Sequence, residues 1–351
     1  MTRDPAARSV PASGPAPRSA SHRMRVRAGS AIVDGFFRGV SALGRLHPSA
    51  KPARQKVEVV KDIPYLSDGL AEHRLDVYRP ANAEFKPPYP VVLYVHGGGF
   101  RILSKDTHWL MGLAFARRGY LVFNISYRLA PAHPFPAAIA DTCAAYEWVT
   151  GHAAEYGGDR SRIIIAGESA GGNLVTSLAV AACYRRPEPY ARAVFDTGVV
   201  PRAVLPACGI LQVSDTERFG RRKKLSRFLL DRLTEVEHAY LAGWTNPGPG
   251  ELDLADPLLV FERGEKPDRP LPPFFAPVGT ADPLLDDTRR LKIALDRLGV
   301  PCEARYYKGE GHAFHAFVFR KAARLCWTDG FEFLTRSLVD AVKEAEHEGA
   351  T

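Results

Sequence analysis

Short apolar runs recur from about residue 55 and, from the third run onward, alternate with segments whose apolar positions return every three or four residues. Strands joined by helices require crossover connections, so the pattern predicts an α/β fold with a mostly parallel sheet and helices on both faces. The predicted strands are residues 56–61, 74–78, 91–96, 121–126, 162–166, 203–213, 274–279 and 302–307. The predicted helices are residues 105–118, 136–150, 170–184, 284–298 and 325–345.

Two further segments have helical periodicity but lie outside this alternation. Residues 31–54 begin with an amphipathic helix, which could lie on a membrane or, as we favour, cover an apolar cleft of the same protein. Residues 215–255 form a predicted helical insert that includes the basic run 221–224. A single four-residue cluster is typical of a solvated helix face and is weak evidence for nucleic-acid binding. The segments 55–214 and 256–351 then form the core.

Residues 1–30 form a predicted disordered tail, because they are rich in Ala, Arg, Ser and Pro. Their composition resembles a transit peptide, but we favour a start site misassigned upstream of Met24. The chain has 47 Lys and Arg against 39 Asp and Glu, a net charge of +8. Six arginines and one aspartate in the tail supply most of it, so we expect no nucleic-acid partner.

The five cysteines are widely spaced and include no CxxC pair. This spacing argues against a disulfide framework and a zinc knuckle. Every apolar run is interrupted before it reaches the ~18 to 20 residues of a membrane-spanning helix, and the chain starts with no apolar signal-peptide core. We therefore expect a cytoplasmic protein without a stable membrane anchor.

A candidate nucleophile lies at the end of the strand predicted at 162–166. Gly167, Ser169 and Gly171 form a G-x-S-x-G pattern between that strand and a small-residue helix start. A serine hydroxyl is a poor nucleophile, so it must project from a tight turn toward a base, and glycines leave room for that approach. In this strand-turn-helix context the pattern predicts a catalytic serine at Ser169.

A glycine run follows the strand predicted at 91–96. The strand ends at His96 and is followed by Gly97, Gly98, Gly99 and Phe100. Consecutive glycines expose their backbone N–H groups, because no side chain covers them. We expect the N–H groups of Gly98, Gly99 and Ala170 to form an oxyanion hole. A flexible loop and a phosphate cradle are the alternatives, but no Lys-Ser/Thr pair follows the glycines.

The chain resembles the hormone-sensitive-lipase-like family of α/β-hydrolase esterases in the order of its motifs. These motifs are HGGGF (96–100), YRLAP (127–131) with HPFPAA (133–138), and GESAGGN (167–173). The resemblance covers roughly residues 55–335. It implies a carboxylic-ester hydrolase with a Ser/Asp/His triad and no cofactor. It also implies a cap made of an N-terminal helical segment and an insert before the last strands.

The triad partners are expected after the serine, in the order acid and then histidine. Asp282 follows the strand 274–279 and matches the family pattern G-x-x-D-P-L, whereas Asp286 and Asp287 fall in the next helix and are expected to be solvated or capping. His312 and His315 both fit the family's H-G-F, and we favour His312 because it directly follows a glycine turn after the last strand. We expect His315 to be a packed or supporting residue. We favour no metal site, because no further ligand lies at a recognised spacing from this histidine pair.

Residues near the predicted site depart from the family pattern. Ser126 and Ala132 replace acidic residues, and Glu168 replaces a smaller neighbour of the serine. Substrate specificity is therefore left open. Several aromatic residues could line the substrate pocket or could be packed in the core. The aromatic residues considered are Phe36, Phe37, Phe100, Phe228 and Trp244.

The sequence predicts an esterase or deacetylase that cleaves short- to medium-acyl esters. With an ordinary histidine base, its activity should rise through about pH 6.5. An arylformamidase-like or amide hydrolase on the same triad is one alternative. A non-catalytic small-ligand receptor is another, although retention of His312 and His315 argues against it. The expected partner is a small ester substrate, and the formation of a homodimer is left open.

Overall fold

The computed structural model describes residues 20–222 and 224–348 and contains one eight-stranded sheet. The strand order is β1-β2-β4-β3-β5-β6-β7-β8. β1 and β2 pair antiparallel with their neighbours, and the pairs from β4 through β3 to β8 are parallel. The predicted α/β fold with a mostly parallel sheet is thus confirmed. The strands are β1 (Val57–Pro64), β2 (Arg74–Pro80), β3 (Tyr89–Val95), β4 (Leu121–Ile125), β5 (Gly158–Glu168), β6 (Ala203–Ala207), β7 (Phe274–Gly279) and β8 (Cys302–Tyr307).

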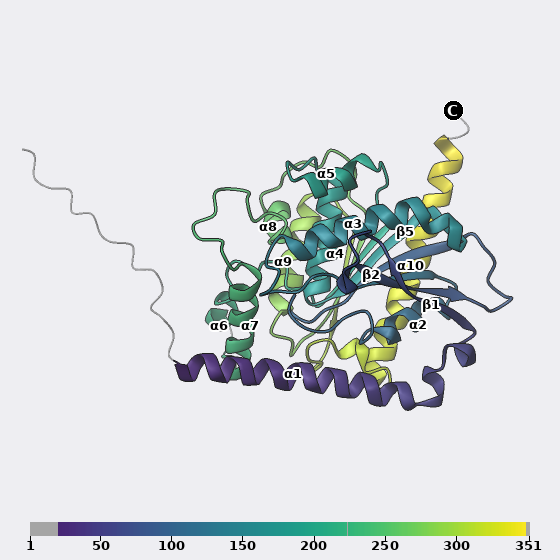
Figure 1. Ribbon diagram of the computed structural model, residues 1–351. Helices are drawn as coiled ribbons and strands as arrows, with labels where there is room; N and C mark the ends of the chain where they lie inside the picture. Colours follow the sequence, from purple (N-terminus) through teal and green to yellow (C-terminus); the bar gives the residue numbers. More distant parts are fainter. Residues whose placement is uncertain (1–19, 223, 349–351) are drawn as a thin grey trace, which may run out of the picture.

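Helices cover both faces of the sheet (Figure 1). Successive residues of β3 point to opposite faces: Val91 and Leu93 pack in one apolar cluster, and Val92 packs in the other. Both faces are buried, which explains why this strand is apolar throughout. The first cluster includes α3 (Ala137–His152), α4 (Ala170–Cys183), α5 (Pro189–Asp196), α8 (Pro257–Glu262) and α9 (Leu285–Arg297), and the second includes α2 (Trp109–Ala116) and α10 (Lys321–Glu348).

Most predicted strands and helices are present with shifted ends, but β6, α5 and α8 differ more from the sequence prediction. β6 ends at Ala207 and not at residue 213, because the amides of Leu211 and Gln212 bond to the Asp287 carboxylate and those of Val213 and Ser214 bond to Asp256. The helices α5 and α8 were not predicted. Both start at a proline, which is favoured in the first turn because its missing N–H has no helical partner there.

The helix α1 (Ala20–Leu46) is longer than predicted, so the disordered tail was assigned too far into the chain. Residues 20–30 are helical because alanine and arginine favour helix and only one glycine interrupts them. Residues 1–19 of that predicted tail lie outside the described residues. α1 runs along one edge of the molecule and contacts α7 (Figure 1). Short 3₁₀ turns at Pro48–Ala50 and Pro52–Gln55 connect it to β1.

The segment 215–255 contains α6 (Arg218–Arg222) and α7 (Arg227–Tyr240). Arg221 and Arg222 of the basic run have exposed side chains that pair with Asp215 and Asp286, as a solvated helix face would. Lys223 lies outside the described residues. The division of the chain into core, cap helix and cap insert stays a prediction.

All five cysteines are free and buried. Burial raises the pKa of each thiol, to about 12 for Cys183 and Cys302. Within residues 20–222 and 224–348, no helix is both long enough and apolar enough to cross a bilayer.

Candidate active site

Ser169 occupies a strained turn between β5 and α4. Its φ is 56°, a left-handed conformation that non-glycine residues rarely adopt. The neighbouring glycines permit the turn: a Cβ on Gly171 would lie 2.0 Å from the carbonyl oxygen of Val95, and one on Gly167 would lie 2.6 Å from the same atom. The serine therefore sits at the N-terminus of α4, where the helix dipole favours negative charge.

The glycine run after β3 is equally constrained. Gly98 has a φ of 111°, and a Cβ there would lie 2.1 Å from the carbonyl oxygen of Ile102. Gly99 has a φ of 58°, and a Cβ there would lie 2.7 Å from Cγ2 of Val236 on α7. These backbone conformations and close contacts favour glycine at both positions. Gly99 also contacts the helical insert, through Val236.

His312 and Asp282 form a hydrogen-bonded pair across two loops. Nδ1 of His312, after β8, donates to Oδ2 of Asp282, after β7, at 2.9 Å. The Asp282 side chain is buried and also accepts the amide of Leu284 at 2.8 Å. Burial alone would lower the pKa of His312, but the Asp282 carboxylate raises it well above 6.5. The Asp282 carboxylate therefore predicts an onset of activity at higher pH than the value near 6.5 expected for an ordinary histidine.

One cavity of about 1170 Å³ brings together Gly98, Gly99, Ser169 and His312. Ala170, the third predicted oxyanion donor, is buried in the first turn of α4 directly after Ser169. Of the five aromatic residues considered above, the cavity is lined by Phe37 and Phe228. Phe100 instead stacks on Tyr240 at 3.7 Å between ring centroids, Trp244 packs against Phe135, and Phe36 is exposed.

Glu168 links the serine turn to the glycine loop. Its Oε1 accepts the Gly97 amide at 2.7 Å and lies 2.6 Å from Nε2 of His108, while Oε2 accepts the hydroxyl of Tyr94. Burial would raise the pKa of Glu168, but His108 outweighs it and lowers that pKa to about 2. Glu168 was noted in the sequence only as a departure, and its partner His108 was missed. A histidine 12 residues after His96 gave no signal, because the contact depends on the fold.

The other two histidines near the site are buried and lie behind it. His96 stacks on Tyr127 at 4.2 Å and donates from Nδ1 to the carbonyl of Gly97 at 2.6 Å, so it supports the glycine loop. Burial lowers its pKa to about 3. His315 also has a pKa lowered by burial, to about 4, and lines a small apolar cavity with Tyr94 and Trp327. Both side chains are neutral at pH 7.

The thiol of Cys208 lies next to the His312–Asp282 pair. One donor atom of each of these three residues lies within 4.8 Å of the others. These sulfur, oxygen and nitrogen atoms are the ones that could hold a metal ion. However, the carboxylate and the imidazole already bond to each other, and the pKa of Cys208 is raised by burial. The donor set suits a hydrogen-bonded pair better than a metal that requires a thiolate.

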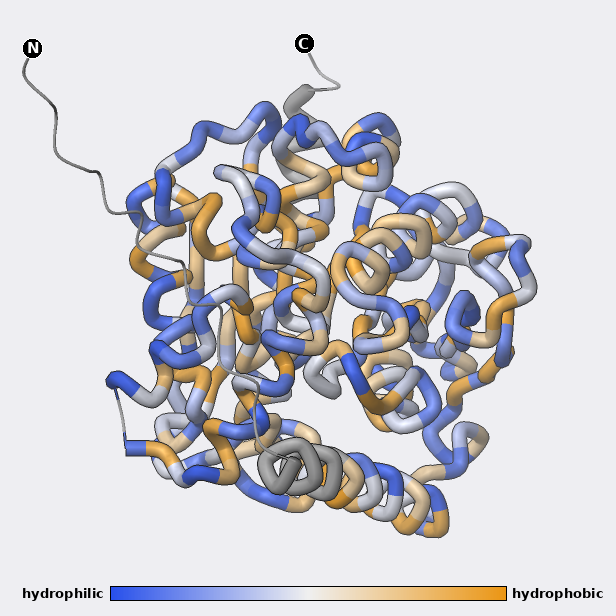
Figure 2. Tube along the Cα trace, turned by 60° about the vertical axis from the view of Figure 1, so that its left-hand side comes forward, coloured by the Kyte–Doolittle hydropathy of each residue, from blue (hydrophilic) through white to orange (hydrophobic). Residues whose placement is uncertain are grey.

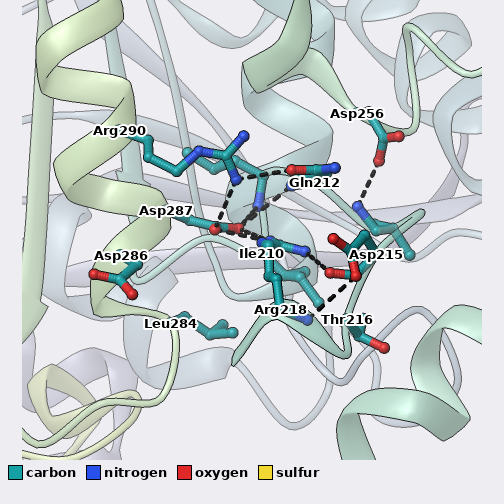
Figure 3. A network of polar contacts seen from close by, with 12 residues as sticks. Ile210, Gln212, Asp215, Thr216, Arg218, Asp256, Leu284, Asp286, Asp287 and Arg290 are labelled. Carbon is teal, nitrogen blue, oxygen red and sulfur yellow. Dashed lines mark hydrogen bonds and ion pairs between the residues drawn. The ribbon is translucent and has the colours of Figure 1, made fainter. Parts of the chain in front are cut away.

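A buried ion pair fixes the loop after β6 (Figure 3). Arg218 of α6 donates to both oxygens of Asp287 at 2.7 and 2.6 Å, and Asp287 also accepts the amide of Leu211 at 2.8 Å. The expectation that Asp287 is solvated or capping was wrong, because Arg218 compensates its charge in the interior. Asp286 does remain partly exposed and pairs with Arg222. The network ties the insert to the segment beside Ser169, where the Ile210 amide donates to the Ser169 carbonyl at 3.3 Å.

Comparison with known proteins agrees with this geometry. A model described as the alpha/beta hydrolase fold matches residues 92–316. The chain is 35% identical over 240 residues to carboxylesterase NlhH of Mycobacterium tuberculosis, covering 67% of this chain and 69% of that protein. It is 33% identical over 251 residues to esterase LipI of the same organism, covering 69% and 71%. The crystal structure of esterase LipW from Mycobacterium marinum superposes with a TM-score of 0.67 at 25% identity, covering 91% of each chain. The chain therefore belongs to the α/β-hydrolase family, in its hormone-sensitive-lipase-like branch of carboxylesterases.

Proposed function

We propose that the chain hydrolyses carboxylic esters through Ser169, His312 and Asp282. His312 takes the proton of the Ser169 hydroxyl as its oxygen attacks the ester carbonyl, and Asp282 orients the imidazole and stabilises its charged form. The alcohol leaves with the proton from His312. Water, deprotonated by the same histidine, then releases the acid and restores the serine.

The proposed oxyanion hole consists of the N–H groups of Gly98, Gly99 and Ala170. Negative charge develops on the carbonyl oxygen in the transition state, and donors held in advance stabilise it there. The tight packing of Gly98 against Ile102 and of Gly99 against Val236 supports this role, because it fixes the loop before substrate arrives.

The observation that carries the proposal is the 2.9 Å bond between His312 and Asp282 beside the cavity that also holds Ser169. A receptor that only binds a ligand has no need for an oriented imidazole beside a strained serine. The apolar walls of the cavity, which include Phe37, Phe228 and Phe317, favour esters with apolar acyl groups, and we propose short- to medium-acyl esters as the substrates. Formamides and amides are the second candidate class, because the same triad can attack them.

The test is hydrolysis of p-nitrophenyl esters from acetate to palmitate, with and without a chelator. Ser169→Ala should lose roughly 10⁴ or more in kcat, because the remaining groups cannot replace the nucleophile. Ser67→Ala, at an exposed loop serine, is the matched control and should retain full activity. Chelator-insensitive turnover that falls beyond medium chains supports the proposal. Folded protein without turnover on any ester would refute it and direct the search to formamides.

A further inference from the structure

Part of the solvent-facing surface of α1 is a stripe of large apolar side chains. Its exposed large residues are Ile32, Phe36, Val40, Leu43 and Leu46, with exposed fractions of 66, 55, 41, 69 and 78%. At about 100° per residue these positions fall on one stripe of the helix. Figure 2 shows orange, hydrophobic residues along this helix at the edge of the molecule. We call these five residues the outer stripe.

The outer stripe is not explained by the packing of α1 on its own protein. A neighbouring side of the helix, with Val33, Phe37 and Ser41, lines the cavity described above, and Val40 at the edge of the stripe lines it too. The charged residues Asp34 and Arg38 lie roughly opposite the stripe and pair with each other at 2.8 Å. α1 therefore has one apolar side for its own protein and another apolar side in solvent, which marks an interaction surface.

The apolar surface extends to residues that line the cavity. Phe228 and Leu229 on α7 are 47 and 36% exposed, and Phe319 before α10 is 76% exposed. All three also line the cavity that contains Ser169. Because the apolar surface includes residues of the cavity wall, an apolar substrate carried by a bound partner could pass from that partner directly into the cavity.

Charge identifies the kind of partner. Residues 20–46 contain five arginines and one aspartate, and the whole chain carries +8. A second copy of the chain would therefore bring positive charge against positive charge. Residues 1–19 cannot cover the stripe either, because Val10 is their only branched aliphatic residue and they contain no aromatic one. An anionic surface with an apolar interior matches both the charge and the stripe.

We propose that the outer stripe, with Phe228, Leu229 and Phe319, docks the protein reversibly on anionic lipid surfaces. The helix lies in the plane of the interface with its apolar side chains among the acyl chains, and the net positive charge of residues 20–46 attracts the anionic headgroups. Transfer of a lipid-dissolved ester into the cavity would follow, and this second part rests on the proposed function.

The test is co-sedimentation of the full chain with vesicles of phosphatidylcholine alone or mixed with phosphatidylglycerol. We expect binding to the mixed vesicles that weakens with salt, and little binding to phosphatidylcholine alone. Phe36→Ser/Leu43→Ser should lower the partition coefficient at least about tenfold, because two apolar side chains no longer enter the lipid. Ile293→Ser on α9, also an exposed apolar position at 52%, is the matched control and should bind as the wild type does.

Two outcomes would overturn the proposal. One is the absence of binding to mixed vesicles by the folded wild-type chain. The other is a dimer in sedimentation equilibrium that the double variant converts to a monomer, because the stripe would then be an interface between copies. Hydrolysis of a soluble acetate ester checks that the double variant folds, because neither Phe36 nor Leu43 lines the cavity. If the double variant does not fold, Ile32→Ser is tested in its place. Ser169→Ala should bind vesicles normally, so a failure of the proposed catalysis is separable from a failure of docking.

Discussion

Oε1 of Glu168 lies 2.6 Å from Nε2 of His108 and 2.7 Å from the amide nitrogen of Gly97. One buried carboxylate oxygen thus joins the residue before the nucleophile to the loop that carries the proposed oxyanion donors. Because Gly97 directly precedes Gly98, the Glu168 side chain helps to fix the position of those donors.

Glu168→Gln tests this dependence. The amide retains the shape of the side chain but loses its charge, so its bonds to His108 and Gly97 weaken and the glycine loop gains freedom. We expect kcat on p-nitrophenyl acetate to fall about tenfold or more with little change in KM, because the loop acts mainly in the transition state. Steady-state kinetics with purified protein measure both constants. A variant with wild-type kcat would show that the carboxylate has only a packing role.

The Glu168–His108 pair should also give stability a defined pH range. The pKa of Glu168 is lowered from 4.5 to about 2, so its contribution is complete above 4.5 and is lost as the pH falls toward 2. The pKa of His108 is raised above 6.5 because Glu168 outweighs the effect of burial, so its contribution is complete below 6.5 and is lost as the pH rises through the raised value.

The difference in Tm between the wild type and Glu168→Gln should therefore be largest between about pH 4.5 and 6.5 and should shrink on either side. Thermal unfolding followed by circular dichroism across this range measures it. His108→Gln should give the same profile, and a difference that does not vary with pH would contradict the ion pair.

The rate of ester hydrolysis should report the pKa of His312. The base must be neutral to accept a proton, and Asp282 raises its pKa well above 6.5 despite burial. We therefore expect the acid limb of kcat/KM to lie above pH 6.5. Asp282→Asn should move the limb to lower pH and reduce kcat by about 10⁴, because the imidazole loses its orientation and the charge that stabilises its protonated form. A wild-type limb at or below pH 6.5 would contradict this account.

Removing one partner of the buried Arg218–Asp287 ion pair should lower the free energy of unfolding more than replacing both partners with apolar residues. Asp287→Ala leaves a buried guanidinium without its carboxylate and should lower the free energy of unfolding by about 3–5 kcal/mol. Arg218→Met/Asp287→Leu removes both charges and should recover most of that loss. Urea denaturation of the three proteins measures the difference. Equal losses in the single and double variants would show that the pair contributes through packing alone.

The sequence was informative where local chemistry determines structure. Apolar runs that end at glycines located β3, β5 and β7, and the turn at Ser169 followed from the glycines beside it. It was uninformative where distant residues meet. Asp287 looked like a surface acid because Arg218 lies 69 residues away in the chain, and His108 looked unremarkable because Glu168 is 60 residues away. The run after Ala207 was apolar enough for a strand, but carboxylates from two other segments hold its backbone.

The burial of all five thiols has a practical consequence for experiments on α1. Because none is exposed and burial raises the pKa of each, maleimide reagents should react slowly with the native protein. A single cysteine introduced at Leu46, at the exposed end of the helix, would then be the only fast-reacting site on the folded chain. An environment-sensitive fluorophore attached there would report the moment at which that end of the helix leaves water.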